Sequence, residues 1–169
     1  GGALEVSSEL GEGTTFRVTL PQAEVEIPRV GPELGTMKSR VGLAGPLLLV
    51  DDEEVLCSAT GELFDEIGVS CFRAGSGSEA LEVLGQHGPS LQAVVLDMTM
   101  PGMSGEETFL ALRETCPSLP VLLTSGYQIT DASSKLCEFP GVCFLEKPYT
   151  FDDLVKALRT LLHPEAGAE

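Results

Sequence analysis

The chain of 169 residues has room for one ordinary domain and a shorter segment, because domains usually span about 100 to 200 residues. Its 26 acidic residues against 10 basic ones leave a formal net charge of -16, so we expect no binding to nucleic acid or anionic membrane. No apolar run reaches about 18 residues and no signal-peptide pattern opens the chain, which favours a cytoplasmic location.

The chain divides into three parts. Residues 1–21 alternate apolar and polar positions on both sides of a glycine-rich turn, which predicts two strands of a hairpin. Residues 22–45 are rich in proline and glycine without periodicity and are interpreted as a flexible linker. In residues 46–165, apolar runs alternate with helical patterns, so we expect the main domain there.

The main domain shows a strand and helix alternation that repeats five times. Apolar runs predict strands over 47–50, 69–73, 93–96, 121–124 and 142–145. Helical spacing follows each run and predicts helices around 56–67, 78–85, 105–115, 131–138 and 151–162. Parallel strands need such crossover helices, so the pattern predicts a doubly wound α/β fold with a five-stranded parallel sheet.

Polar residues stand where these strands end. They are Asp51, Asp52, Asp97, Thr124 and Lys147. Ligands of such sheets bind beyond the carboxyl ends of the strands, so we expect these side chains to converge there. Three crowded carboxylates repel one another unless a cation intervenes, and an all-oxygen ligand set suits Mg²⁺. With a lysine, a hydroxyl and an aspartate nucleophile, the set has the parts that phosphoryl transfer needs.

Each member of this set has an ordinary structural explanation when it is taken alone. Acidic residues such as those in 51–54 stabilise a helix N-terminus by about 0.3–1 kcal/mol each. A single Asp97 could be a loop residue or a helix cap, and a single Lys147 could be a solvated surface charge. The functional interpretation therefore depends on their coincidence at the strand ends of one sheet.

Four segments carry a resemblance to a known family. They are LLLVDDEE from Leu47, DMTMPGMSG from Asp97, LLTSGY from Leu122 and FLEKPY from Phe144. They resemble the four signature segments of a two-component receiver domain, and the resemblance covers residues 46 to about 163. It implies a flavodoxin-like sheet with the strand order 2-1-3-4-5, and a cis peptide bond before the proline of Lys147-Pro148.

The resemblance also implies a role for each site residue. Asp97 would be the phosphoacceptor, and Mg²⁺ would be held by Asp51, Asp52, Asp97 and the backbone carbonyl of Thr99. Thr124 and Lys147 would contact the phosphoryl group. Phe144 would be the aromatic residue that changes rotamer with Thr124 when the domain switches. The chain would then catalyse its own aspartyl phosphorylation and dephosphorylation with a phosphohistidine as donor.

The first segment carries a second resemblance. GGALEVSSELGEGTTFRVTLP, residues 1–21, is similar to the last two strands of a histidine-kinase ATP-binding domain. The order of the two resemblances implies the C-terminal end of a hybrid sensor histidine kinase, whose parent protein could be membrane-anchored. We expect no ATP binding and no kinase activity from this chain. Its partners would be a histidine kinase or histidine phosphotransfer domain, with a weak dimer through the 131–138, 142–145 and 151–162 surface.

Two alternatives remain open at this point. Residues 75–80, GSGSEA, follow a strand and open a helix in the form of a dinucleotide fingerprint, which would indicate a nucleotide-binding Rossmann-like domain. That interpretation leaves the strand-end residues unexplained. The other alternative is a receiver-like interaction module that signals by contact without phosphorylation.

The cysteines and histidines add little chemistry. The five cysteines form no CxxC pair and are expected to be buried free thiols of a reducing compartment. His87 and His163 are expected to be exposed and outside any helix that could present a phosphorylated histidine.

Overall fold

The computed structural model describes residues 2–11, 13–21, 42–43, 45–126 and 135–163. The chain separates into two units, within 1–31 and 32–169, which we describe one at a time. Within the described ranges, none of the helices combines the length and apolar content that a membrane crossing needs.

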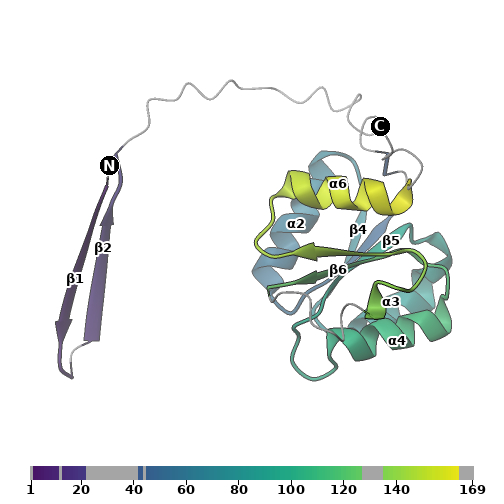
Figure 1. Cartoon of the computed structure of the whole chain (residues 1–169), viewed down its shortest axis with the longest axis horizontal. Helices are drawn as coiled ribbons and strands as arrows, with labels where there is room; N and C mark the ends of the chain where they lie inside the picture. Colours follow the sequence, from purple (N-terminus) through teal and green to yellow (C-terminus); the bar gives the residue numbers. More distant parts are fainter. Residues whose placement is uncertain (1, 12, 22–41, 44, 127–134, 164–169) are drawn as a thin grey trace. The chain divides into compact units, whose positions relative to one another are not determined.

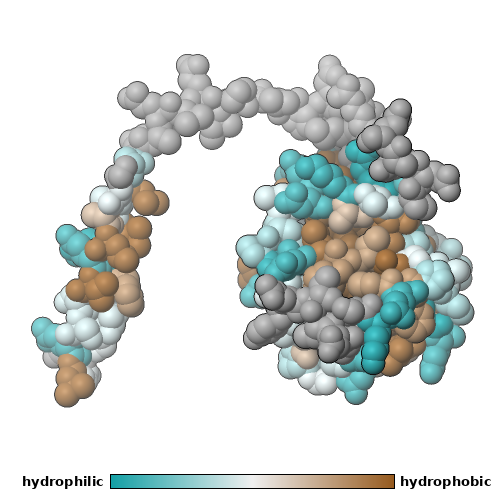
Figure 2. All heavy atoms as spheres, in the orientation of Figure 1, coloured by the Kyte–Doolittle hydropathy of each residue, from teal (hydrophilic) through white to brown (hydrophobic). Residues whose placement is uncertain are grey.

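The N-terminal unit contains the expected hairpin, in which β1 (Ala3–Glu9) pairs antiparallel with β2 (Gly13–Thr19). Leu4 pairs with Val18 and Val6 with Phe16, so the apolar side chains share one face of the ribbon. All four are more than half exposed, and Figure 2 shows hydrophobic atoms at the surface of the hairpin. A two-stranded ribbon with an uncovered apolar face is marginal by itself in water.

The second unit is built on a parallel sheet of five strands. They are β3 (Leu47–Val50), β4 (Cys71–Ala74), β5 (Ala93–Asp97), β6 (Val121–Ser125) and β7 (Val142–Glu146). Their spatial order is β4-β3-β5-β6-β7, which confirms the predicted order 2-1-3-4-5. The three central strands are buried throughout, as expected for a parallel sheet that is covered on both faces.

Helices cover both faces of this sheet, as Figure 1 shows. The helical elements are α2 (Glu54–Glu66), α3 (Gly77–His87), the 3-10 turn η1 (Gly88–Ser90), α4 (Gly105–Thr115) and α6 (Phe151–Leu162). α2 and α6 pack on one face around Phe64 and Leu158, whereas α3 and α4 pack on the other around Leu84 and Phe109. Residues 131–134 of the helix predicted over 131–138 lie outside the described residues, and of the remainder 135–136 are helical and 137–138 form a turn.

Helix starts follow from local sequence. Ser104 and Glu107 form a reciprocal capping box at the start of α4, and Thr150 and Asp153 form another at α6. Each box satisfies backbone N–H groups that have no partner inside the helix. The two starts that flank the carboxyl edge of the sheet are thus fixed by their own side chains.

The packed unit begins earlier than the predicted boundary at residue 46. Leu43 is only 1% exposed and belongs to the apolar cluster beneath α6. The carbonyl of Gly42 lies 3.2 Å from His163 Nε2, and the amide of Gly45 donates to Gln92 Oε1 at 2.8 Å. The sequence did not predict the burial of Leu43, because the surrounding prolines and glycines indicate a linker and no apolar residues at helix or strand spacing accompany this leucine.

Two smaller expectations need correction. His87 is the last residue of α3 and is half-buried, because its ring stacks on Phe72 with centroids 4.3 Å apart. His163 is exposed, as expected. All five cysteines are free, yet only Cys57 is buried, and the other four are half-buried.

Candidate functional site

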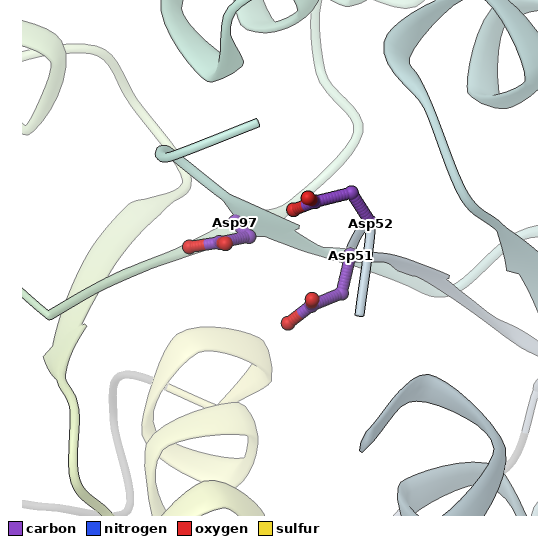
Figure 3. A group of neighbouring side chains, drawn as sticks. All are labelled: Asp51, Asp52 and Asp97. Atoms are coloured by element: carbon purple, nitrogen blue, oxygen red, sulfur yellow. The ribbon is translucent and has the colours of Figure 1, made fainter. Parts of the chain in front are cut away.

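The sheet brings two acidic segments together at its carboxyl edge. Val50 pairs with Leu96 in the parallel register of β3 and β5, so the residues that follow or end these strands are neighbours. Asp51, Asp52 and Asp97 each offer a carboxylate oxygen, and these three oxygens all lie within 4.8 Å of one another. Figure 3 shows the three side chains gathered where β3 and β5 end.

Lys147 reaches this cluster from the end of β7. Its Nζ atom donates to Asp51 Oδ2 at 2.9 Å and lies 3.3 Å from Asp97 Oδ2. The peptide bond between Lys147 and Pro148 is cis, as the resemblance implied. Both acidic partners and the lysine are largely withdrawn from water, so the pairs are screened less than surface ion pairs.

One ammonium group lies among three carboxylates and pairs with two of them, Asp51 and Asp97. Burial raises the pKa of Asp97 above its ordinary value; Lys147 opposes that shift and the charge of Asp51 adds to it. Burial alone would lower the pKa of Lys147, but its hydrogen bond to Asp51 and the charges of Asp97 and Asp51 outweigh burial and raise it. The site therefore holds its cation firmly and still carries excess negative charge.

The acceptor oxygen at the centre of this cluster lacks a partner. Asp97 is 5% exposed, and its Oδ1 atom is buried without any hydrogen-bond donor. A pocket opens beside it, lined by Asp51, Asp52, Asp97, Thr99, Gly126 and Lys147 together with Glu53 and Leu56. A bound cation would compensate the buried, unpaired carboxylate oxygen and the negative charge of the pocket, and oxygen-only donors suit Mg²⁺.

Thr124 is placed to face Asp97. The two residues pair across β5 and β6, so their side chains leave the sheet on the same side, toward α2 and α6. Thr124 is 1% exposed. Phe144 pairs with Leu123 one step earlier in β6, and it packs on the opposite face, in the cluster of α3 and α4. The structure thus brings Asp97 and Thr124 together and sets Phe144 on the other side of the sheet.

Sequence reasoning missed Tyr149. This residue follows Lys147-Pro148 and packs against the α2 and α6 cluster, where it lines a small pocket with Thr124, Asp51 and Cys57. Burial raises the pKa of its phenol above the ordinary value. The only signal in the sequence was an aromatic residue before a helix cap, which by itself indicates ordinary packing.

The backbone around Asp97 is held by a close approach. A Cβ atom added to Gly105 would lie 2.6 Å from the carbonyl oxygen of Asp97 and would also collide with the Cα atom of Met98. Only glycine allows α4 to begin this close to the end of β5. The start of α4 thereby fixes the backbone of Asp97 and Met98.

The segment over 75–80 is used for helix capping and packing. Ser76 caps α3 by accepting the amide of Glu79, and Glu79 Oε2 in turn accepts the amide of Gly75 at 2.8 Å. A side chain on Gly77 would collide with Thr108 of α4 and crowd Met103. These amides and glycines are therefore already engaged, and the Rossmann-like alternative finds no phosphate cradle here.

Comparisons with known proteins agree with this geometry. Residues 47–159 match the family model "Response regulator receiver domain". Sensor kinase CckA of Brucella abortus is 29% identical over 98% of this chain and 18% of its own length, and sporulation initiation phosphotransferase F of Bacillus subtilis is 28% identical over 69% of this chain and 92% of its own. The solved receiver domain of hybrid histidine kinase CckA superposes with TM-score 0.59 and 27% identity, covering 70% of this chain and 99% of that one.

Proposed function

Because the chain belongs to the family of response regulator receiver domains, we propose that Asp97 is the residue that accepts the phosphoryl group. The observation that carries this choice is the buried Asp97 Oδ1 atom without a donor, beside a pocket that Lys147 also lines. Asp51 and Asp52 lie in the same cluster, but the Asp51 side chain is already bound by Lys147 and Asp52 is exposed. Asp97 is the buried carboxylate of the cluster, and one of its oxygens has no hydrogen-bond partner.

In the proposed reaction an oxygen of Asp97 attacks the phosphorus of a phosphohistidine. A P–O bond forms as the P–N bond breaks, and the bonding pair returns to the imidazole nitrogen, which leaves a mixed acyl phosphate on Asp97. Lys147 neutralises charge on Asp97 and on the incoming phosphoryl oxygens. Thr124 donates its hydroxyl hydrogen to one of these oxygens, since it shares the side of the sheet with Asp97.

The acidic cluster would hold the metal ion of this chemistry. Asp51, Asp52 and Asp97 would supply carboxylate oxygens, and the Thr99 carbonyl, from a residue that lines the same pocket, would supply a fourth ligand. Bound Mg²⁺ would offset the excess negative charge and polarise the phosphoryl group.

The proposal is tested by incubating the whole chain with acetyl phosphate, with and without Mg²⁺, and by measuring the mass of the intact protein by mass spectrometry. One phosphoryl group should be added only in the presence of Mg²⁺, and Asp97→Asn should abolish the addition while the fold is kept. Asp152→Asn, at an exposed aspartate in the first turn of α6, is the matched control and should label like the wild type. Labelling that persists in Asp97→Asn would reject Asp97 as the acceptor.

We further propose that the chain is the C-terminal part of a hybrid sensor histidine kinase. In support, nearly the whole chain aligns with a sensor kinase of which it spans 18%, so the alignment extends beyond the receiver domain into the hairpin. The hairpin would be the end of an ATP-binding domain, residues 22–45 would connect it, and the receiver would occupy about 46–165. The exposed apolar face of the hairpin is what we expect of a ribbon that completes a larger sheet.

The proposed partners follow from the same chemistry. The donor would be the phosphohistidine of a histidine kinase or of a phosphotransfer domain, and the net charge of -16 opposes nucleic acid as a partner. A weak dimer would use β7 and α6, where β7 is an edge strand with half-buried side chains. Five free cysteines fit a reducing compartment, in agreement with a cytoplasmic location.

A further inference from the structure

A second pocket shares the acidic pair Asp51 and Asp52 with the pocket beside Asp97. It has a volume of about 460 Å³ and is formed where β3 and β4 end and α2 and α3 begin. The other charged side chains that line it are Glu54, Arg73 and Glu79. Four carboxylates thus line this pocket with a single guanidinium group, that of Arg73.

The guanidinium group of Arg73 lies across helix α2. Arg73 leaves the edge strand β4 on the same side as Cys71, which packs in the cluster of α2 and α6. Its Nη2 atom lies 3.3 Å from Oδ2 of Asp65, in the last turn of α2. The two side chains are 38% and 59% exposed, and an ion pair this exposed contributes little to stability. The ion pair alone therefore holds Arg73 only weakly.

Gly61 makes the room that Arg73 occupies. It is buried in the middle of α2, where glycine weakens a helix relative to alanine. A Cβ atom added to Gly61 would overlap Nε and Nη2 of Arg73 and would lie 2.6 Å from its Cζ atom. The three heavy atoms nearest to that Cβ position all belong to Arg73. Because a guanidinium group ends a flexible side chain, a methyl group at this position would displace it.

A displaced Arg73 would be attracted into the pocket that it already lines. Asp51 is paired with Lys147, whereas Asp52 and Glu54 are exposed and form no ion pair within the described ranges. A guanidinium group beside Asp52 would neutralise a carboxylate that the Mg²⁺ site needs and would repel the divalent ion. Arginine keeps its charge at any pH at which the protein is folded, so it would compete with Mg²⁺ throughout that range.

We propose that Gly61 is a positioning residue for the metal site, which keeps Arg73 on α2 beside Asp65 and thereby leaves Asp52 free for Mg²⁺. The inference rests on the proposed Mg²⁺ site. The two cationic side chains around the acidic cluster then have different roles. Lys147 is bound within the cluster, whereas Arg73 is held at the α2 wall of the second pocket.

The test is a double-mutant cycle on the whole chain, with Gly61→Ala, Arg73→Ala and the double variant. Mg²⁺ is titrated at fixed ionic strength, and the amide shift of Asp52 gives the Kd. Gly61→Ala should weaken the Kd about three- to tenfold, as expected for one unit charge brought close to a divalent ion in a largely solvated site. In the Arg73→Ala background the same change should have no effect. Gly85→Ala, where the new methyl group meets nothing within 4 Å, should leave the Kd unchanged.

Two further readouts separate this role from a general effect on helix α2. The loss of affinity in Gly61→Ala should shrink at high salt, because charges near the surface are screened. The Nε–H resonance of Arg73 should shift in the metal-free variant and stay in place in Gly85→Ala. An unchanged Kd, an equal loss with and without Arg73, or an Arg73 resonance that ignores Gly61→Ala would overturn the inference. A wild type that does not bind Mg²⁺ would overturn the proposed metal site and, with it, this role of Gly61.

Discussion

Lys147 and Asp97 are paired through only one of the two carboxylate oxygens. Nζ lies 3.3 Å from Oδ2, while Oδ1 of the same carboxylate is buried without a donor. A buried acceptor without a donor costs stability in the resting protein, because its hydration is lost and not replaced. The pair therefore fixes the orientation of Asp97 and leaves one oxygen available for chemistry.

Because the unpaired Asp97 carboxylate destabilises the resting protein, we expect that removing its charge stabilises the metal-free protein to an extent that depends on pH. The pKa of Asp97 is raised in the folded state, so protonation of Asp97 favours folding, and that contribution is lost as the pH rises from about 3.8 through the raised value. Asp97→Asn removes the charge and should melt at a higher temperature than the wild type at pH 7 in the presence of a chelator. The difference in Tm should shrink toward pH 4. A Tm difference that is the same at both pH values would contradict the assignment.

Mg²⁺ should stabilise the folded protein through the same cluster. A ligand that binds only the native state adds about 2.7 kcal/mol at one hundred times its Kd. Asp52→Ala removes one carboxylate of the cluster and should abolish most of the Mg²⁺-dependent rise in Tm, and it relieves repulsion in the metal-free state. Thermal melts with and without Mg²⁺ measure both effects. Equal Mg²⁺ sensitivity of wild type and Asp52→Ala would count against the site.

Gly105 should be needed to keep the backbone of Asp97 and Met98 in its present position. A methyl group there meets the backbone of Asp97 and Met98, which cannot move as a side chain can, so Gly105→Ala should cost about 1–3 kcal/mol and slow phosphorylation. Gly85→Ala is the matched control, since the new methyl group meets nothing within 4 Å at an exposed position of α3. That change should stabilise by up to about 1 kcal/mol. Equal stability of the two variants in denaturant titrations would refute the close-approach argument.

Leu43 should tie the N-terminal side of the receiver to α6. The side chain is 1% exposed in the cluster of Leu158 and Leu161, so Leu43→Ala should lose about 2–5 kcal/mol of unfolding free energy. A chain that starts at Gly42 should keep its stability, whereas one that starts at Pro46 should lose a similar amount to Leu43→Ala. If the chain from Pro46 were as stable as the chain from Gly42, Leu43 would contribute nothing.

The carboxyl edge of the sheet was predictable because its signals are local in the sequence. Apolar runs that stop at Asp51, Asp97 or Lys147 mark strand ends, and parallel topology then brings strand ends together. The structure places these side chains within contact range, as expected. Alternation of strand and helix patterns similarly predicted the doubly wound fold, whereas the strand order was implied by the resemblance to receiver domains.

Other features depend on contacts that no local pattern encodes. Leu43 is buried by helix α6, which lies more than a hundred residues later, and its proline- and glycine-rich surroundings indicate a linker. Tyr149 and Thr124 line the same small pocket because both lie on the α2 and α6 side of the sheet. Gly77 belongs to a glycine pattern that also fits a dinucleotide site, and only its approach to Thr108 shows that it serves packing.

The last prediction concerns how far the signal spreads from Asp97. A phosphoryl group that draws Thr124 toward it shifts the end of β6, where the neighbouring residue Leu123 pairs with Phe144 of β7. We expect Phe144 to change its rotamer in response to that shift, a local event that biases a two-state element. Amide shifts over 135–150 should therefore respond to beryllofluoride with Mg²⁺ more strongly than those over 78–87 in α3.

Two variants separate transmission from ligand binding in this experiment. Thr124→Ala should keep the shift at Asp97 itself and lose most of the response at Phe144, because the hydroxyl that moves is gone. Thr60→Val should keep both responses, since its hydroxyl lines the neighbouring pocket without contacting Asp97. Responses over 135–150 that persist in Thr124→Ala would mean that the signal reaches β7 through Lys147, the other residue that links Asp97 to that strand.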